Sequence, residues 1–214
     1  MAQLLRVNAF SVSLDGYGAG PDQSLDDPIG RGGHRLHEWL FGTRTFGERF
    51  GMDGTGEGVD DLFARTDFDG IGAGIMGRNM FGPVRGPWDP DQPWTGWWGD
   101  RPPYGHPVFV LTHHPREPLE MEGGTTFHFV TGGIHEARER ALAAADGADV
   151  RINGGVDTIR QFLRAGLVDR LNLALVPTLL GEGERLLGDG VDGLECIGFT
   201  ATPSAVHIQL AKTA

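Results

Sequence analysis

Positive charge and cysteine are both scarce in this chain. Its 214 residues include 18 lysines and arginines against 29 aspartates and glutamates, which gives a formal net charge of −11. Such an acidic chain is not expected to have nucleic acid or an anionic membrane as its main partner. The single cysteine, Cys196, excludes an intrachain disulfide and a metal cage built from cysteines.

Long apolar runs are also missing. No stretch approaches the roughly 18 apolar residues of a membrane-spanning helix. The chain shows no charged and then apolar leader, so a cytoplasmic location is the default expectation. Its length suits one domain with a substantial core, and we expect a single domain over residues 1–214.

Glycine and proline are abundant instead, with 35 and 13 residues, and they concentrate before residue 106. Residues 82–107 hold seven of the prolines with four tryptophans between them, from Trp88 to Trp98. No regular element is expected at that proline density. The four tryptophan side chains are expected to be buried. A packed loop or a subunit contact is favoured over a substrate cage as the place of their burial.

Hydrophobic periodicity divides the rest of the chain into strands and helices. Residues 18–33 and 42–58 are expected to be glycine-rich loops. Strands alternating with helices indicate an α/β domain with a largely parallel sheet. The predicted strands are 4–14, 71–76, 108–111, 125–130, 150–152, 171–176 and 206–210, and the predicted helices are 36–41, 59–64, 134–145 and 158–165.

The most informative segment is Val150–Leu163, in which a strand ends in a glycine pair and a helical pattern follows at once. Gly154 and Gly155 have no Cβ to block a ligand, and the helix start offers unpaired amides and a positive dipole end. A glycine pair alone also fits a tight turn. A second strand–glycine–helix junction at Ile75–Phe81 supports the interpretation of the glycine pair as a ligand site, because two such junctions in one small domain suggest a nucleotide.

Arg78 supports the same interpretation. A cation at a helix start is disfavoured by the helix dipole unless an anion joins it, which a phosphate would do. Two histidine pairs could suggest a metal instead. His113 and His114 are adjacent on an extended strand and so point to opposite faces, and His34 and His37 have no third ligand nearby. No metal site is expected.

Five segments together resemble the dihydrofolate reductase-like superfamily, and most closely the branch of the riboflavin-biosynthesis reductase domain. They are Asn8–Gly16, Met76–Phe81, Val110–Pro115, Asn153–Gly155 and Gly166–Gly183. The resemblance implies a three-layer α/β/α domain around a central, mostly parallel mixed sheet. It leaves out two loop-rich insertions, at about 18–66 and 83–106.

The resemblance also implies NADPH as the cofactor and a cis peptide within the glycine pair. Four residues at the first junction would meet the phosphates, three at a strand end would lie by the adenosine ribose and its 2′-phosphate, and the glycine pair with its neighbours would lie under the nicotinamide and pyrophosphate. These cofactor residues are Gly77, Arg78, Asn79 and Met80, then Thr112, His113 and His114, then Asn153, Gly154, Gly155, Val156, Asp157 and Thr158.

For the substrate, the resemblance points to Asn8, Ser11, Ser13 and Asp15 at the edge of the pocket. Asp15 is the candidate catalytic residue, although an Asp-Gly turn explains it about as well. The superfamily's acidic residue on the first long helix has no recognisable counterpart, and Asp60 and Asp61 are candidates only by elimination.

The function implied is an NADPH-dependent oxidoreductase that transfers hydride to a C=N or C=O group of a small heterocyclic or carbonyl substrate. A homodimer is expected from the resemblance and from the tryptophan-rich segment. One alternative is a true pyrimidine or pterin reductase of riboflavin or folate metabolism. Another is an NADP(H)-binding sensor or assembly module without catalysis.

Overall fold

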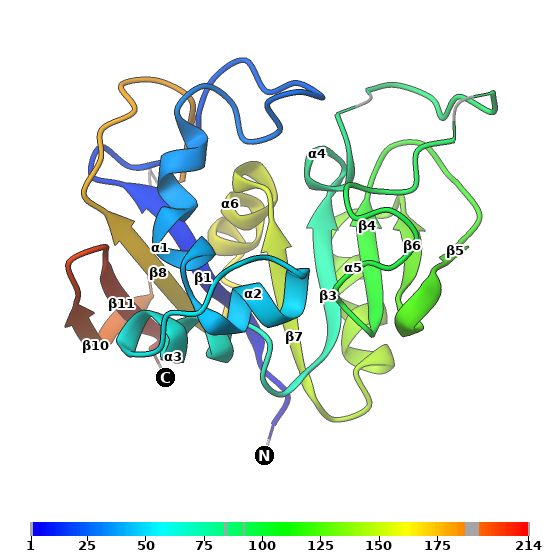
Figure 1. The fold of residues 1–214 in the computed structure, drawn as a ribbon. Coiled ribbons are helices and arrows are strands. Elements are labelled where there is room, and N and C mark those ends of the chain that lie inside the picture. The colour runs from blue at the N-terminus through cyan, green and yellow to red at the C-terminus, as the bar shows by residue number, and fades with distance from the viewer. Residues whose placement is uncertain (1, 84, 92, 187–192, 214) are drawn as a thin grey trace.

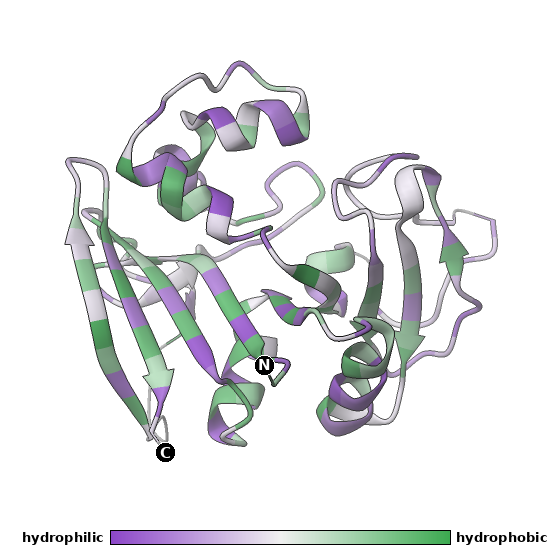
Figure 2. Cartoon of the chain, turned by 90° about the horizontal axis from the view of Figure 1, so that it is seen from below, coloured by the Kyte–Doolittle hydropathy of each residue, from purple (hydrophilic) through white to green (hydrophobic). Residues whose placement is uncertain are grey.

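The computed structural model of the protein describes residues 2–83, 85–91, 93–186 and 193–213. A nine-stranded sheet runs through it in the order β10-β11-β8-β1-β7-β3-β4-β6-β5, and helices lie on both of its faces (Figures 1 and 2). The strands are β1 (Leu5–Ser13), β3 (Ile71–Gly77), β4 (Pro107–Leu111), β5 (Leu119–Glu120), β6 (Thr126–Val130), β7 (Asp149–Gly154), β8 (Arg170–Val176), β10 (Leu194–Ala201) and β11 (Val206–Lys212). A separate small sheet pairs β2 (Tyr17–Ala19) with β9 (Glu184–Arg185).

The helical elements are η1 (Gly33–His37), α1 (Glu38–Phe41), α2 (Arg44–Phe50), α3 (Val59–Thr66), α4 (Arg78–Phe81), η2 (Glu122–Gly124), α5 (Gly133–Ala144) and α6 (Val156–Arg164). Strands β8, β1, β7, β3, β4 and β6 pair in parallel, and β5, β10 and β11 pair antiparallel. The predicted three-layer α/β/α fold with a mostly parallel mixed sheet is confirmed.

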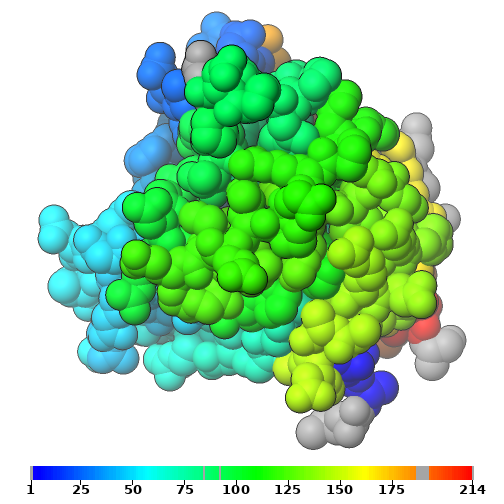
Figure 3. Space-filling model, turned by 90° about the vertical axis from the view of Figure 1, so that its right-hand side faces the viewer, coloured from blue at the N-terminus to red at the C-terminus, as the bar shows by residue number. Residues whose placement is uncertain are grey.

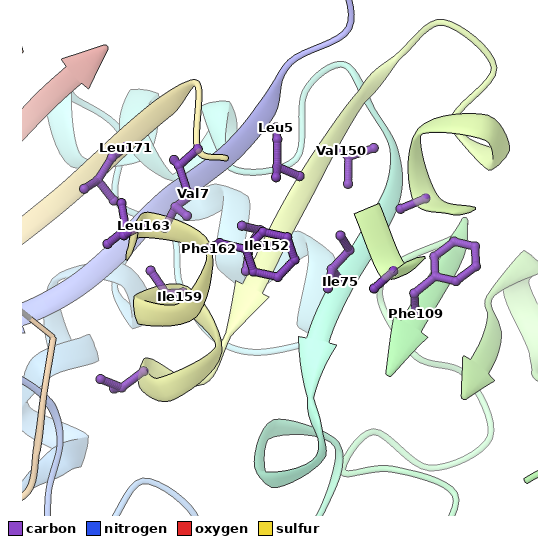
Figure 4. Close-up of a cluster of buried hydrophobic side chains, with 14 of the residues drawn as sticks. Leu5, Val7, Ile75, Phe109, Val150, Ile152, Ile159, Phe162, Leu163 and Leu171 are labelled. Carbon is purple, nitrogen blue, oxygen red and sulfur yellow. The ribbon is translucent and has the colours of Figure 1, made fainter. Parts of the chain in front are cut away.

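Alternation along the strands sends apolar side chains to both faces of the sheet. Leu171 and Leu173 of β8 belong to the core beneath α5 and α6, which Figure 4 shows in part. Ala174 and Val176 of the same strand belong to the core beneath α1, α2 and α3. A third cluster lies under α4 and includes Phe81. Because both faces are covered, strands β3 and β4 are apolar nearly throughout.

The sequence analysis is wrong about residues 42–58, which contain the helix α2 instead of a continuous loop. The Thr43 side chain accepts a hydrogen bond from the amide of Phe46 at 3.3 Å, which caps the helix, and Gly51 ends it in the left-handed conformation at φ 67°. A Cβ on Gly47 would collide with the backbone oxygen of Gly54. Gly47, one of the glycines for which a loop was predicted, is therefore needed for the close packing of α2 against Gly54.

The tryptophan-rich segment has no regular element among its described residues, as predicted; Val84 and Gln92 lie outside them. Trp88 and Trp94 pack against the cluster that contains Phe81, and Trp94 donates its indole N–H to the Phe81 carbonyl at 2.7 Å. This matches the packed-loop interpretation. Among the described helices, none is long and apolar enough to cross a membrane.

Candidate cofactor site

The carboxyl ends of four parallel strands meet at one edge of the sheet. Strand β3 ends at Gly77, β4 at Leu111, β6 at Val130 and β7 at Gly154. A cavity of about 320 Å³ lies at this edge, lined by the strand ends and by the turns and helix starts that follow them. Crevices outside the carboxyl ends of parallel strands are the usual ligand sites of open α/β sheets.

Most of the predicted cofactor residues line this cavity. Nine of the thirteen do so, and the other four lie beside it. The nine are Gly77, Arg78, Asn79, Thr112, His113, His114, Gly155, Asp157 and Thr158. Of the rest, Val156 is buried in the core below α6, and Met80 contacts Gly154. Asn153 is 5% exposed, and neither amide atom of its side chain has a hydrogen-bond partner within the described ranges.

The glycines at the two junctions are required by close approach. A Cβ on Gly77 would overlap the Thr158 hydroxyl, so the end of β3 can meet the start of α6 only without a side chain. The peptide between Gly154 and Gly155 is cis. Gly154 has φ 129°, and a Cβ there would lie 2.9 Å from the Met80 sulfur. The cis peptide that the family resemblance implied is present.

Arg78 is the main cation of the cavity. Its Nε, Nη1 and Nη2 atoms are all buried, and none has a hydrogen-bond partner among the residues that the structure describes. Its guanidinium carbon lies 3.2 Å from the centroid of the Trp88 ring. Burial first, and then the charges of Arg116 and Arg85, lower the pKa of Arg78 to about 10. An arginine held in this way among other cations has unused donors for an anion.

Two helix starts add partial positive charge at the same cavity. Helix α5 begins at Gly133 and α6 at Val156, and the N-cap residues Gly132 and Gly155 provide no capping side chain. The first amides of these helices therefore have no capping partner from those positions. Gly133 and Gly155 both line the cavity. Backbone amides at helix starts are suited to phosphate oxygens.

Two acidic side chains, Asp157 and Glu184, also line the cavity. The Asp157 carboxylate accepts hydrogen bonds from Arg160 Nη2 at 2.8 Å and from the Gln161 side chain at 2.8 Å. The hydrogen bond from Arg160 is the largest cause that lowers the pKa of Asp157. Burial, and then the charge of Asp157, raise the pKa of Glu184. The cavity thus has a cationic side at Arg78 and a side that accepts hydrogen bonds, as a ribose hydroxyl would need.

The end of β4 is fixed by a local turn. The Thr112 hydroxyl accepts a hydrogen bond from the His114 amide at 3.1 Å, and the Trp88 indole N–H donates to the His114 carbonyl at 2.8 Å.

Among the described residues, no group of three or more His, Cys, Asp or Glu side chains is arranged to hold a metal ion.

The predicted substrate residues of β1 are not brought into this cavity. Asn8 donates to the Thr66 carbonyl at 3.0 Å and accepts from Asn172 at 3.0 Å. Ser11 accepts from the Trp39 indole N–H at 2.9 Å. These polar groups are buried and bonded within the protein, and their role toward a substrate stays a prediction.

Asp15 joins two loops. The Ser13 hydroxyl donates to its carboxylate at 2.6 Å, and the amides of Leu180 and Gly181 donate at 3.1 and 2.7 Å. The hydrogen bond from Ser13 is the largest cause that lowers the pKa of Asp15 to about 2. A carboxylate with this pKa carries no proton near neutrality, so the contacts favour the turn-closing interpretation over a proton donor. Asp60 and Asp61 bond to His207 and to the Thr45 amide, respectively.

The sequence analysis missed several cavity residues. Thr131 lies between β6 and α5, and Gly133 begins α5, so this junction repeats the strand–glycine–helix pattern and could have been found by it. Arg85 comes from the proline-rich segment and Glu184 from the short strand β9, where no local pattern indicated a ligand. Only the fold brings these two side chains to the strand ends.

Comparisons with known proteins agree with this arrangement. The family model of the RibD C-terminal domain matches residues 6–208. No curated protein sequence matches the chain. A riboflavin biosynthesis protein from Shewanella sp. PV-4 has a similar structure, with a TM-score of 0.61, 24% identity and full coverage of both chains.

Two other solved structures share the fold. RibD from Acinetobacter baumannii has a TM-score of 0.55 and 15% identity over 99% of this chain and 58% of that one. Dihydrofolate reductase from Enterococcus faecalis, complexed with NADP(H) and RAB-propyl, has a TM-score of 0.51 and 13% identity over 99% of this chain and 97% of that one. The fold is therefore dihydrofolate reductase-like, and a reductase of riboflavin or folate type is supported. The chain belongs to the RibD C-terminal domain family.

Proposed function

We propose that the protein is an NADPH-dependent reductase that transfers hydride to a C=N or C=O group of a small heterocyclic or carbonyl substrate. The observation that carries the proposal is the buried guanidinium of Arg78, which has no hydrogen-bond partner in the described part of the chain and lies at the shared edge of four parallel strands. A buried cation without a counter-ion is costly, and an anionic ligand would remove that cost.

The residues of the cavity fit the phosphates of NADPH. Arg78 offers a forked donor, and the starts of α5 and α6 offer backbone amides. Thr112, His113 and His114 line the same cavity and would lie by the adenosine ribose and its 2′-phosphate. The dihydrofolate reductase that shares this fold was crystallised with NADP(H), which supports the same cofactor here.

When bound, the cofactor supplies the hydride. The protein holds the cofactor ring and the substrate in position. Gly155 has open space where a Cβ would be, which leaves room for a ring against the backbone at the end of β7, and Met80 fills the corresponding space at Gly154 and closes that side. Holding the two reacting groups in contact distance gives much of the rate, since it replaces an encounter in solution by a fixed geometry.

The test is NADPH oxidation by the full chain with a panel of pyrimidinones, pterins and simple ketones or imines. The absorbance of the reduced nicotinamide reports turnover, and calorimetric titration with NADPH reports binding separately. Turnover with a pyrimidinone or pterin would identify a riboflavin- or folate-type reductase. Binding without turnover across the panel would favour the sensor or assembly module. Absence of NADPH binding would overturn the proposal.

We also propose that the protein forms a homodimer, as the family resemblance implies. Trp88 and Trp94 pack against their own chain, whereas the Trp98 indole is 39% exposed and accessible to a second copy. Sedimentation velocity at micromolar concentration checks the assembly directly, and a single monomeric species would overturn it.

A further inference from the structure

A second and larger cavity, of about 780 Å³, adjoins the cofactor cavity. It is lined by the indoles of Trp88 and Trp94, by three prolines of the same segment, and by Leu25, Asp89 and Arg116. Leu25 comes from the loop between β2 and η1, so both insertions outside the family resemblance meet at this cavity. Figures 1 and 3 show the N-terminal loop and the proline-rich segment approaching each other at the top of the molecule.

The walls of this cavity are flat and rigid. The indole N–H groups of Trp88 and Trp94 already donate to backbone carbonyls, at 2.8 and 2.7 Å. The rings are therefore fixed in place, and a ligand would meet them by van der Waals contact and not by hydrogen bonds to nitrogen. Indoles and prolines lose little conformational freedom when a ligand binds, which favours a flat apolar ring.

One end of the cavity is cationic. Arg116 lies 4.8 Å from the Trp88 ring centroid, and its Nη1 donates to the Trp94 carbonyl at 2.6 Å, which leaves other guanidinium donors. Asp89 is the acidic residue of the lining, and one of its carboxylate oxygens accepts from the Asp91 amide at 2.9 Å in a local turn. The Arg116 end is suited to an anionic substituent.

Trp88 connects the two cavities. Its ring contacts Arg78, which lines the cofactor cavity, and Arg116, which lines the second one. Its indole N–H holds the His114 carbonyl at the end of β4. A ligand in the second cavity would thus lie across Trp88 from Arg78, at the proposed phosphate end of the cofactor site, and a substrate held there would extend from it toward Gly154 and Gly155.

We propose that the second cavity is the substrate-recognition subsite of the reductase and takes a planar aromatic ring with an anionic substituent, the ring against the indoles and prolines and the anion beside Arg116. The proposal rests on the proposed function, because it assigns the subsite to the same enzyme's substrate. The subsite itself is formed by the apoprotein and can be tested without cofactor.

The probe is 2-naphthoate, titrated calorimetrically into the full chain. Cyclohexanecarboxylate, which is anionic but not flat, and 2-naphthamide, which is flat but neutral, are the matched ligands. Leu25→Glu places a carboxylate on the cavity wall at an exposed position, and Leu62→Glu on α3 makes the same change at a similarly exposed position away from it (59% and 54% exposed).

We expect one 2-naphthoate to bind per chain, more tightly than either matched ligand. Leu25→Glu should weaken this binding by about twofold to tenfold through like-charge repulsion, and Leu62→Glu should leave it unchanged. Arg116→Gln should weaken 2-naphthoate but not 2-naphthamide. Equal effects of the two glutamate variants, or equal binding of all three ligands, would overturn the assignment.

NADPH separates this result from the proposed function. Saturation with NADPH should leave the 2-naphthoate site available, whereas simple competition would place the probe in the cofactor cavity and overturn the inference. If NADPH does not bind but 2-naphthoate behaves as expected, the proposed cofactor fails and the aromatic-anion subsite stands. If NADPH binds and 2-naphthoate does not, the subsite alone is wrong.

Discussion

The guanidinium carbon of Arg78 lies 3.2 Å from the centroid of the Trp88 ring, although the two residues come from different kinds of segment. Arg78 begins α4 directly after a buried strand, and Trp88 lies in the proline-rich segment. The ring holds the arginine in place without using any of its hydrogen-bond donors. The cation is thus positioned before a ligand arrives.

Replacing Trp88 with leucine should weaken both the fold and the cofactor site. A cation–π contact and part of an aromatic cluster are lost, which should lower the free energy of unfolding by about 1–3 kcal/mol. With Arg78 released, NADPH affinity should fall by about threefold to tenfold. Urea unfolding and calorimetry measure the two effects. Trp98→Leu, at a 39% exposed indole, is the control and should leave NADPH affinity unchanged.

Gly77→Ala should separate the end of β3 from the start of α6. The new methyl group would overlap the Thr158 hydroxyl, and such overpacking typically costs about 1–3 kcal/mol. Thr158→Ala removes that hydroxyl, so the double variant should recover part of the lost stability. A double-mutant cycle of urea unfolding measures the coupling. Strict additivity of the two changes would show that the contact does not constrain the junction.

The sequence analysis predicted the residues that line the strand-end cavity better than those that line the second cavity, for a physical reason. A backbone cradle requires glycine next to a strand and a helix start, so Gly77, Gly154 and Gly155 are visible from local pattern alone. Arg85, Glu184 and Leu25 reach their cavities through tertiary folding of loops, which leaves no local pattern. Helix α2 was missed because its glycine satisfies a contact with Gly54 that only the fold creates.

The same distinction applies to strands. Strands β3 and β4 are continuous apolar runs, whereas β7 and β8 alternate apolar and polar residues, and all four were predicted close to their bounds. Strand β10 was missed because it lies at the edge of the sheet and is largely exposed, so burial imposes little pattern on it. The mostly parallel order follows from alternation of strands and helices, whereas the antiparallel β10–β11 pair at the end does not.

Asp15→Asn should destabilise the protein near neutral pH without removing NADPH binding. The carboxylate accepts from Ser13, Gly181 and Leu180, and its pKa of about 2 lies below the ordinary value of 3.8. This contribution to stability is therefore present above pH 3.8 and is lost as the pH falls through about 2. Melting temperatures across pH should show the variant's deficit shrinking in acid, and Asp26→Asn should show no such deficit. A large loss of turnover at unchanged stability would instead restore Asp15 as a catalytic residue.

His37 should make the fold sensitive to mild acid. Burial is the largest cause that lowers the pKa of His37 to about 4 from 6.5. Between these values the unfolded chain takes up a proton that the folded protein does not, so stability falls as the pH falls through this window. His37→Gln should flatten the dependence by at most about 3 kcal/mol in chemical unfolding. His135→Gln, at an exposed position on α5, should leave the dependence unchanged.

The most direct test of the central claim is calorimetric titration of NADPH into the wild-type protein and into Arg78→Gln, with the exposed Arg35→Gln as control. The account predicts one NADPH per chain and a dissociation constant at least about tenfold higher in Arg78→Gln alone, since a charge-assisted contact is lost. Arg78→Gln also removes the cation–π contact with Trp88, so urea unfolding of each variant shows whether the titrated protein is folded. No NADPH binding to the wild type, or equal affinity in Arg78→Gln, would contradict the account.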